Sequence, residues 1–187
     1  AERRGRTCYD DVKINGLCTV ILRASNMIGP RSSTTGQGKF IQWLDSALSA
    51  SLAKTFEEDK QSSSVRLFVD EIRSFVYVRD VARFVLAAAV AEKLPDDGKS
   101  EVAVYNLGGL EALSRADLGH RVCEVRDILK DVASQIISLE KRADVVGGAY
   151  PSPLDIGMDS SKILQDFGNT MKITTLEDAL KESLDNS

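Results

Sequence analysis

A nearly continuous apolar run, Leu17 to Leu22, constrains the fold of this chain more than any other feature of its sequence. The run is rich in branched residues and follows directly after Gly16. A strand with apolar side chains on both of its faces is typical of the centre of a parallel sheet, where other layers cover both faces. We therefore expect a central parallel strand at this position, with strand neighbours on both edges.

Further helices and strands are indicated in alternation along the chain. Helical spacing of apolar residues predicts a helix over residues 39–52, and VRLFV and RSFVYV predict two short strands. A helix over VARFVLAAAVAEKL, a strand over EVAVYNLGG and a helix over SRADLGHRVCEVRDIL follow, the last with Ser114 as N-cap and Asp117 completing a capping-box variant. The remaining signals are a strand at QIISLE and helices at DSSKILQDFG and TTLEDALKESL. This alternation predicts a layered α/β fold.

Composition and charge narrow the classes of function. The chain has 187 residues, 43% of them hydrophobic, and a net charge of −4 with the two signs interspersed. A nucleic-acid partner is not expected, because phosphate binding requires a concentrated basic surface. No apolar stretch approaches the roughly 20 residues that span a bilayer, and the first residues carry no export signal. We expect a cytoplasmic protein with no membrane contact.

The cysteine and histidine residues do not form a metal or redox pattern. The cysteines, Cys8, Cys18 and Cys123, are widely spaced and lack the CxxC arrangement. His120 has no second ligand or nucleophile at helical spacing. We expect free thiols, a packing or surface role for His120, and no metal site.

Four motifs occur in one order between residues 22 and 168. LRASNMIGP is similar to LRxxNVYGP, RSFVYVRDVA to RDFVYVDDVA, YNLGG to the identical motif, and LDIGMDSSKILQDFG to xDxxLDxSKxxxxLG. Together they resemble the extended short-chain dehydrogenase/reductase family of NAD(P)-dependent epimerases, dehydratases and reductases. VDEIRSFVYVRDVA further resembles the branch that includes dTDP-4-dehydrorhamnose reductase and the regulatory subunit of methionine adenosyltransferase. The chain departs from that branch at Phe75-Val76, where Pro-Thr is usual.

The dinucleotide-binding signature of that family is missing from the sequence. No GxxGxxG motif occurs. YDDVK, from Tyr9 to Lys13, has the Tyr-x-x-x-Lys spacing of the family's catalytic pair, but Tyr9 precedes Arg23 by only 14 residues. The helix that carries the family's pair requires more than about 20 residues before that strand arginine. We interpret YDDVK as a coincidence and expect the true pair upstream of Ala1, so that the chain holds no catalytic residue.

The resemblance implies that the chain is the carboxy-terminal part of a Rossmann-like, doubly wound α/β fold. Residues 1–187 then form one region, in which 1–30 end the Rossmann core and 31–187 combine core strands with a small substrate-binding lobe. The dinucleotide-binding half is expected to be missing. The resemblance therefore implies NAD or NADP in a full-length parent and no cofactor for this chain alone.

The same resemblance assigns the candidate site residues. Ser25 and Asn26 follow the predicted strand and are expected to contact the cofactor, and Asn26 and Arg73 to bind substrate, Arg73 through a diphosphate. From the residues alone, Asn26 serves equally well as a turn former before Gly29, and Arg73 as a surface arginine on an edge strand. Pro151-Ser152-Pro153 stands where nucleotide-binding members often carry Arg-Pro, which weakens the case for a diphosphate-linked sugar.

Other conspicuous side chains are expected to be structural. Asp80 is placed to stabilise the beginning of a helix, and Trp43 and Tyr77 are expected to be packing residues rather than stacking platforms.

Three functions stay open at this point. The first is the substrate-binding portion of an NAD(P)-dependent sugar-nucleotide reductase or epimerase, not catalytic on its own. The second is a non-catalytic regulatory subunit of the methionine adenosyltransferase type, and the third is an inactive truncated product. The corresponding partners are a small-molecule ligand such as a nucleotide sugar, or a partner enzyme subunit, with an oligomer also open.

Overall fold

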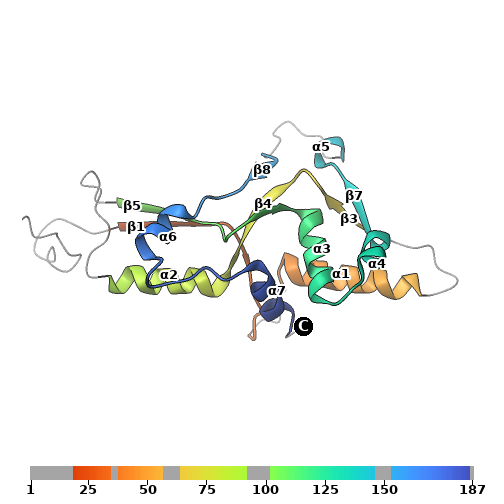
Figure 1. The fold of residues 1–187 in the computed structure, drawn as a ribbon, viewed down its shortest axis with the longest axis horizontal. Helices are drawn as coiled ribbons and strands as arrows, with labels where there is room; N and C mark the ends of the chain where they lie inside the picture. The colour runs from red at the N-terminus through yellow and green to blue at the C-terminus, as the bar shows by residue number, and fades with distance from the viewer. Residues whose placement is uncertain (1–18, 35–37, 57–63, 92–101, 146–152, 186–187) are drawn as a thin grey trace, which may run out of the picture.

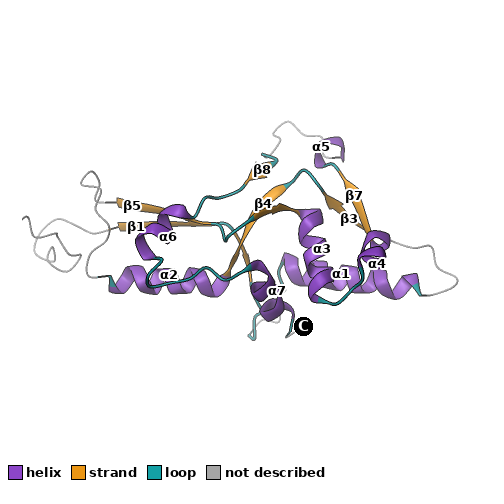
Figure 2. Cartoon of the chain, in the orientation of Figure 1, coloured by secondary structure: helices purple, strands orange, loops and turns teal. Residues whose placement is uncertain are grey.

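The computed structural model describes residues 19–34, 38–56, 64–91, 102–145 and 153–185 (Figure 1). In these residues strands and helices alternate along the chain, and most strand pairs are parallel (Figure 2). The predicted α/β class is confirmed.

The elements have the following bounds. The strands are β1 (Thr19–Ala24), β2 (Asn26–Ile28), β3 (Val65–Phe68), β4 (Ile72–Tyr77), β5 (Val102–Leu107), β6 (Ala112–Ser114), β7 (Ile137–Glu140) and β8 (Asp155–Ile156). The helices are α1 (Phe40–Thr55), α2 (Val78–Val90), α3 (Arg115–Val125), α4 (Lys130–Ile136), α5 (Arg142–Val145), α6 (Ser161–Phe167) and α7 (Leu176–Leu184).

Strand β4 lies between two outer strand pairs. At one end of the molecule β1 pairs in parallel with β5, and at the other β3 pairs in parallel with β7 (Figure 1). β4 itself pairs in parallel with β2 and β8 and antiparallel with β6. In Figure 1, α2 and α6 lie beside β1 and β5, whereas α1, α3 and α4 lie beside β3 and β7.

The buried side chains divide into two clusters, which we call the larger core and the smaller core. The larger core is built from β2, β3, β4, β6, β7 and the helices α1, α3, α4 and α7; Leu44, Leu118 and Leu180 lie at its centre with no exposed surface. The smaller core joins β4, β5, α2 and α6 around the rings of Phe84 and Tyr105, whose centroids lie 5.3 Å apart.

Successive side chains of β4 serve different cores, because neighbours along a strand point to opposite faces. Phe75 and Tyr77 belong to the larger core, and Val76 between them belongs to the smaller core. β4 is therefore the element that joins the two packing units.

The predicted strand around Leu17 to Leu22 is confirmed only in part. Residues 17 and 18 lie outside the described residues, and β1 begins at Thr19. Val20 and Leu22 pack against the smaller core, but Ile21 on the opposite face is 43% exposed. The expectation of two covered faces is therefore not met within the described residues, because no described element packs over the Ile21 face.

Two local predictions failed. The alternative of Asn26 as a turn former before Gly29 does not hold, because Asn26–Ile28 pairs with β4 and Ile28 is buried. Trp43 was expected to be a packing residue, but it is 55% exposed and contacts the Phe40 ring one turn away on α1, with centroids 5.5 Å apart.

Other local predictions are confirmed. Tyr77 is buried, and its hydroxyl donates to the Glu182 carboxylate at 2.6 Å. Ser114 caps α3: its hydroxyl accepts from the Asp117 amide at 3.0 Å, and the Asp117 carboxylate accepts from the Ser114 amide at 3.0 Å. Among the described helices, none is long and apolar enough to cross a membrane.

Candidate ligand-binding site

Ser25 lies between β1 and β2, at the junction of the β1–β5 pair with the β2–β4 pair. Its amide donates to the Leu107 carbonyl on β5 at 3.0 Å, and its hydroxyl donates to the Ser74 carbonyl on β4. Asn26 follows at once as the first residue of β2, where it is exposed and aligned with Phe75. The structure thus brings Ser25 and Asn26 to the carboxyl end of a parallel strand, where open α/β sheets bind ligands.

The YNLGG motif reaches the same junction through its glycines. Gly109 has a φ of 82°, and a Cβ at this position would collide with the Phe75 carbonyl of β4. Gly108 donates its amide to the Ser160 hydroxyl at 2.8 Å. The motif therefore lets the end of β5 lie against β4 without a side chain between the two backbones.

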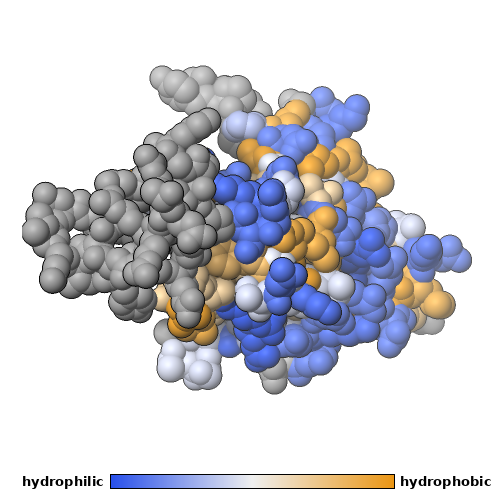
Figure 3. Space-filling model, turned by 60° about the vertical axis from the view of Figure 1, so that its left-hand side comes forward, coloured by the Kyte–Doolittle hydropathy of each residue, from blue (hydrophilic) through white to orange (hydrophobic). Residues whose placement is uncertain are grey.

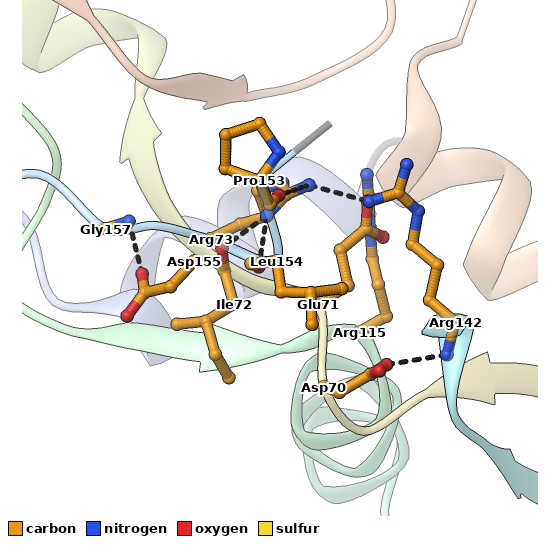
Figure 4. Close-up of polar contacts among 10 residues, drawn as sticks. All are labelled: Asp70, Glu71, Ile72, Arg73, Arg115, Arg142, Pro153, Leu154, Asp155 and Gly157. Carbon is orange, nitrogen blue, oxygen red and sulfur yellow. Dashed lines mark hydrogen bonds and ion pairs between the residues drawn. The ribbon is translucent and has the colours of Figure 1, made fainter. Parts of the chain in front are cut away.

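Arg73 lies in β4, but its guanidinium is enclosed by protein acceptors. The residue is only 5% exposed. Its Nη1 donates to the carbonyls of Ile72 and Leu154, both at 2.7 Å (Figure 4). Its Nη2 donates to the Glu71 carboxylate at 2.7 Å and to the Pro153 carbonyl at 3.4 Å. Arg73 thus fastens the start of β4 to the segment that leads into β8, and its role as a substrate ligand stays a prediction.

Glu71 links Arg73 to a second guanidinium, that of Arg115 at the start of α3. The Glu71 Oε2 atom accepts from Arg115 Nε at 3.0 Å, while Oε1 accepts from Arg73. The Arg115 guanidinium carbon lies 4.0 Å above the centre of the Phe40 ring, a cation–π contact that holds its plane. A single half-buried carboxylate therefore orients two arginines from different elements.

A third arginine completes this group, which we call the arginine cluster: Arg73, Arg115 and Arg142 with Glu71 and Asp70. The Arg142 amide donates to the Asp70 carboxylate at 2.7 Å, and in Figure 4 its side chain points in the same direction as that of Arg115, toward Glu71. With three guanidinium groups and two carboxylates, the cluster carries an excess of one positive charge. Sequence reasoning singled out Arg73 alone, because Arg115 and Arg142 belong to no motif and nothing in VDEIRSFVYVRDVA marks Glu71 as a partner of an arginine.

Asp80 is a structural residue, as predicted. It lies in the first turn of α2 and is fully buried. Its carboxylate accepts from the Thr174 amide and hydroxyl, both at 2.8 Å, and from Arg83 at 2.7 Å. Asp80 thereby ties α2 to the segment that precedes α7.

The described residues contain no group of three or more side chains that could hold a metal ion. Cys123 is buried in the larger core, and burial, reinforced by the nearby Asp45 carboxylate, raises the pKa of its thiol to about 11. A thiol with so high a pKa is a poor nucleophile at neutral pH. Cys8, Cys18 and the YDDVK segment lie outside the described residues.

The described residues fit only one end of a dinucleotide cofactor. Asn26 is exposed beside Ser25, and their junction offers hydroxyl and amide groups of the kind that contact a nicotinamide ring or a sugar. A pyrophosphate requires a glycine-rich turn that opens a helix, and the sequence has no GxxGxxG motif.

Solved structures of similar fold align with nearly all of this chain. The aligned part is less than half of each of those longer chains. They include the enzyme WbmH from Bordetella bronchiseptica in complex with NAD⁺, at 22% identity and a TM-score of 0.57, over 91% of this chain and 46% of that chain. UDP-glucuronic acid 4-epimerase from Bacillus cereus, in complex with UDP-glucuronic acid and NAD, matches at 19% identity and a TM-score of 0.58 over 91% and 45%. A dTDP-4-dehydrorhamnose reductase from Clostridium acetobutylicum matches at 11% identity and a TM-score of 0.58 over 89% and 48%.

At these identities the structural likeness establishes the fold, and the chain spans about half of the length of the proteins that it resembles. No curated protein sequence matches the chain. The model of the NAD dependent epimerase/dehydratase family matches residues 7–108, which is more than half of the 187 residues. That stretch contains Ser25, Asn26, Arg73 and β5, so the match covers the strands that meet at the junction. The chain belongs to the NAD dependent epimerase/dehydratase family.

Proposed function

We propose that this chain is the substrate-binding portion of an NAD(P)-dependent reductase or epimerase that acts on a nucleotide sugar, close to the dTDP-4-dehydrorhamnose reductase branch. The observation that carries the proposal is the Ser25–Asn26 junction at the end of β1, held by hydrogen bonds to both β4 and β5. A ligand group bound there would contact the exposed amide side chain of Asn26, on backbone that these hydrogen bonds hold in place. Similar folds in complex with NAD and UDP-glucuronic acid support the same assignment.

In this proposal Asn26 orients the sugar and Ser25 fixes the backbone beneath it. NAD or NADP, when bound, supplies or accepts the hydride. The phosphate cradle for that cofactor lies in a part of the protein other than this sequence, which has no GxxGxxG loop. We infer that the chain alone binds the sugar nucleotide weakly and does not bind NAD(P)H with useful affinity.

The alternative of a regulatory subunit of the methionine adenosyltransferase type has less support. No contact among the described residues favours a partner enzyme over a small ligand at the junction. A chain that binds no nucleotide sugar and captures methionine adenosyltransferase instead would select this alternative.

Saturation-transfer NMR of the chain with UDP-glucuronic acid and dTDP-glucose tests the proposal. We expect saturable binding that Asn26→Ala weakens about tenfold, the effect of losing one or two ligand hydrogen bonds. Asn169→Ala serves as the matched control, because Asn169 is an exposed asparagine in the turn after α6. Parent chain that binds neither sugar nucleotide would refute the proposal. A saturable change in NADPH fluorescence at micromolar concentration would refute the division between sugar and cofactor sites.

A further inference from the structure

We propose that Arg115, rather than Arg73, offers its guanidinium to the phosphate groups of the ligand, and that Arg73 is a structural clamp. This inference rests on the proposed function, since it names the residue that holds the anionic part of a nucleotide sugar. It also assigns to the arginine cluster a role that no motif indicated.

The first step is that Arg73 has little donor capacity left. Its two Nη atoms carry four hydrogens, and the structure provides four acceptors for them: three backbone carbonyls and the Glu71 carboxylate. A two-pronged contact with a diphosphate would have to break some of these bonds. Because Arg73 is only 5% exposed, such a ligand would also have to displace the segment around Leu154 that lies against the guanidinium.

The second step is that Arg115 has donors to spare. Among the described residues its only hydrogen-bond acceptor is Glu71, which accepts from Nε, so Nη1 and Nη2 have no acceptor there. The side chain is 22% exposed, enough for the outer edge of the guanidinium to meet a ligand. The Phe40 ring at 4.0 Å and the Glu71 carboxylate fix the plane of this group before any ligand arrives. A planar guanidinium held in this way is suited to two-pronged phosphate recognition.

The charge of the cluster also favours an anion. Glu71 is the one carboxylate that accepts from the guanidinium groups of Arg73 and Arg115, so these three side chains carry one excess positive charge on a chain whose net charge is −4. This local excess favours an anion over a neutral or cationic ligand. Arg115 also begins α3, whose amino-terminal dipole adds to the attraction.

The test is a crossed pair of variants, with the uridine diphosphate affinity measured by calorimetry and the thermal unfolding midpoint measured for each. Arg115→Gln is expected to weaken UDP binding about tenfold and to change the midpoint little. Arg115→Lys keeps the positive charge but lacks the planar guanidinium that makes a two-pronged contact, and an intermediate loss of UDP affinity is expected. Arg73→Lys is expected to lower the midpoint while the chain that remains folded binds UDP within about twofold of the parent.

Arg121→Gln is the matched control, because Arg121 lies on the same helix and its guanidinium pairs with Glu111 and Glu124 on the surface. Its UDP affinity should equal that of the parent. Equal UDP affinity in Arg115→Gln and parent, or a tenfold loss confined to Arg73→Lys, would overturn the assignment and leave the proposed function standing.

Uridine and inorganic pyrophosphate separate the two proposals further. The assignment of the phosphate contact is supported if Arg115→Gln leaves the affinity for uridine unchanged and weakens the affinity for pyrophosphate. If pyrophosphate binds through Arg115 but no nucleotide sugar binds, the proposed function fails and the anion site remains. If neither UDP nor pyrophosphate binds the parent chain, the assignment fails.

Discussion

The two cores differ in how completely the described elements enclose them. The larger core is surrounded by strands and by α1, α3, α4 and α7, and Ile41, Leu44 and Leu118 have no exposed surface. The smaller core lies on one face of the β1–β5 pair, between that pair and the helices α2 and α6. The opposite face of the pair exposes Ile21 and Val102, at 43% and 40%.

This difference shows that the β1–β5 half is the less completely enclosed of the two among the described residues. Its inner face is apolar and packs in the smaller core, whereas its open face mixes apolar Ile21 and Val104 with polar Arg23 and Asn106. Figure 3 shows apolar surface beside the atoms drawn in grey, with further apolar patches at the upper right and the right edge among polar surface. The β1–β5 pair is stabilised by helix packing on one face, which a two-stranded unit requires.

The largest expected effect separates the two cores directly. Leu118→Ala in the larger core should lower the free energy of unfolding by about 2–5 kcal/mol, because it leaves a cavity in a fully enclosed site. Leu107→Ala in the smaller core removes an equally buried side chain. Urea unfolding followed by the fluorescence of Trp43, the only tryptophan, reports on the larger-core half.

We expect Leu118→Ala to shift the Trp43 transition strongly and Leu107→Ala to shift it less. The comparison between the cores breaks down if both variants shift the Trp43 transition equally, since the two cores would then unfold as one unit.

An effect of intermediate size is expected from the polar pair that braces the larger core. Arg126 donates to both carboxylate oxygens of Asp45, at 2.8 and 2.7 Å, and this contact raises the pKa of Arg126. Asp45→Asn should lower the free energy of unfolding by about 2 kcal/mol, because a two-pronged charged contact is lost beside a buried side chain.

The corresponding polar contact of the smaller core runs from the Tyr105 hydroxyl to the Asp166 carboxylate, at 2.9 Å. Asp166→Asn should cost less than about 1 kcal/mol, because an amide oxygen can accept the same hydrogen bond. Chemical denaturation of both variants measures the difference, and a larger loss for Asp166→Asn would reverse the ranking of the two cores.

The smallest expected effect on stability concerns the open face of β1. Ile21→Thr keeps a branched strand former while it removes apolar surface, so the free energy of unfolding should change by less than about 0.5 kcal/mol. Self-association measured by light scattering should fall, because exposed apolar strand surface pairs with other chains. Leu22→Thr is the matched control, since Leu22 packs against the smaller core and its loss should reduce stability. Unchanged self-association in Ile21→Thr would remove this face as the cause.

Much of the element order could be predicted because local signals were strong. The capping pair of Ser114 and Asp117 and the alternation in VRLFV and RSFVYV depend on a few neighbouring residues, and the structure contains both. The short helix α4 was not predicted, because its seven residues are fewer than the window over which helical spacing of apolar residues is recognised. The exposure of Trp43 depends on which elements approach α1, and no local pattern records that.

The candidate site divides in the same way. Ser25 and Asn26 could be placed from the sequence because they end a strand inside a motif, and the structure brings them to the junction with β4 and β5. The arginine cluster could not, since Glu71 lies in the connection before β4, Arg115 in α3 and Arg142 in α5, and the three meet only in the fold. The carbonyls around Arg73 were equally invisible, because two of them belong to a segment about 80 residues later.

Because successive side chains of β4 pack in different cores, the position of each residue along this strand is fixed. Phe75 and Tyr77 pack in the larger core and Val76 packs in the smaller core. The loss or gain of a single residue within β4 would turn every later side chain of the strand to the opposite face, and therefore into the wrong core. An insertion in the connection between β3 and β4 changes only the length of that connection, whereas α2 follows β4 without a connection. Among natural variants of this chain, length differences should therefore collect before β4 and be absent within its six residues.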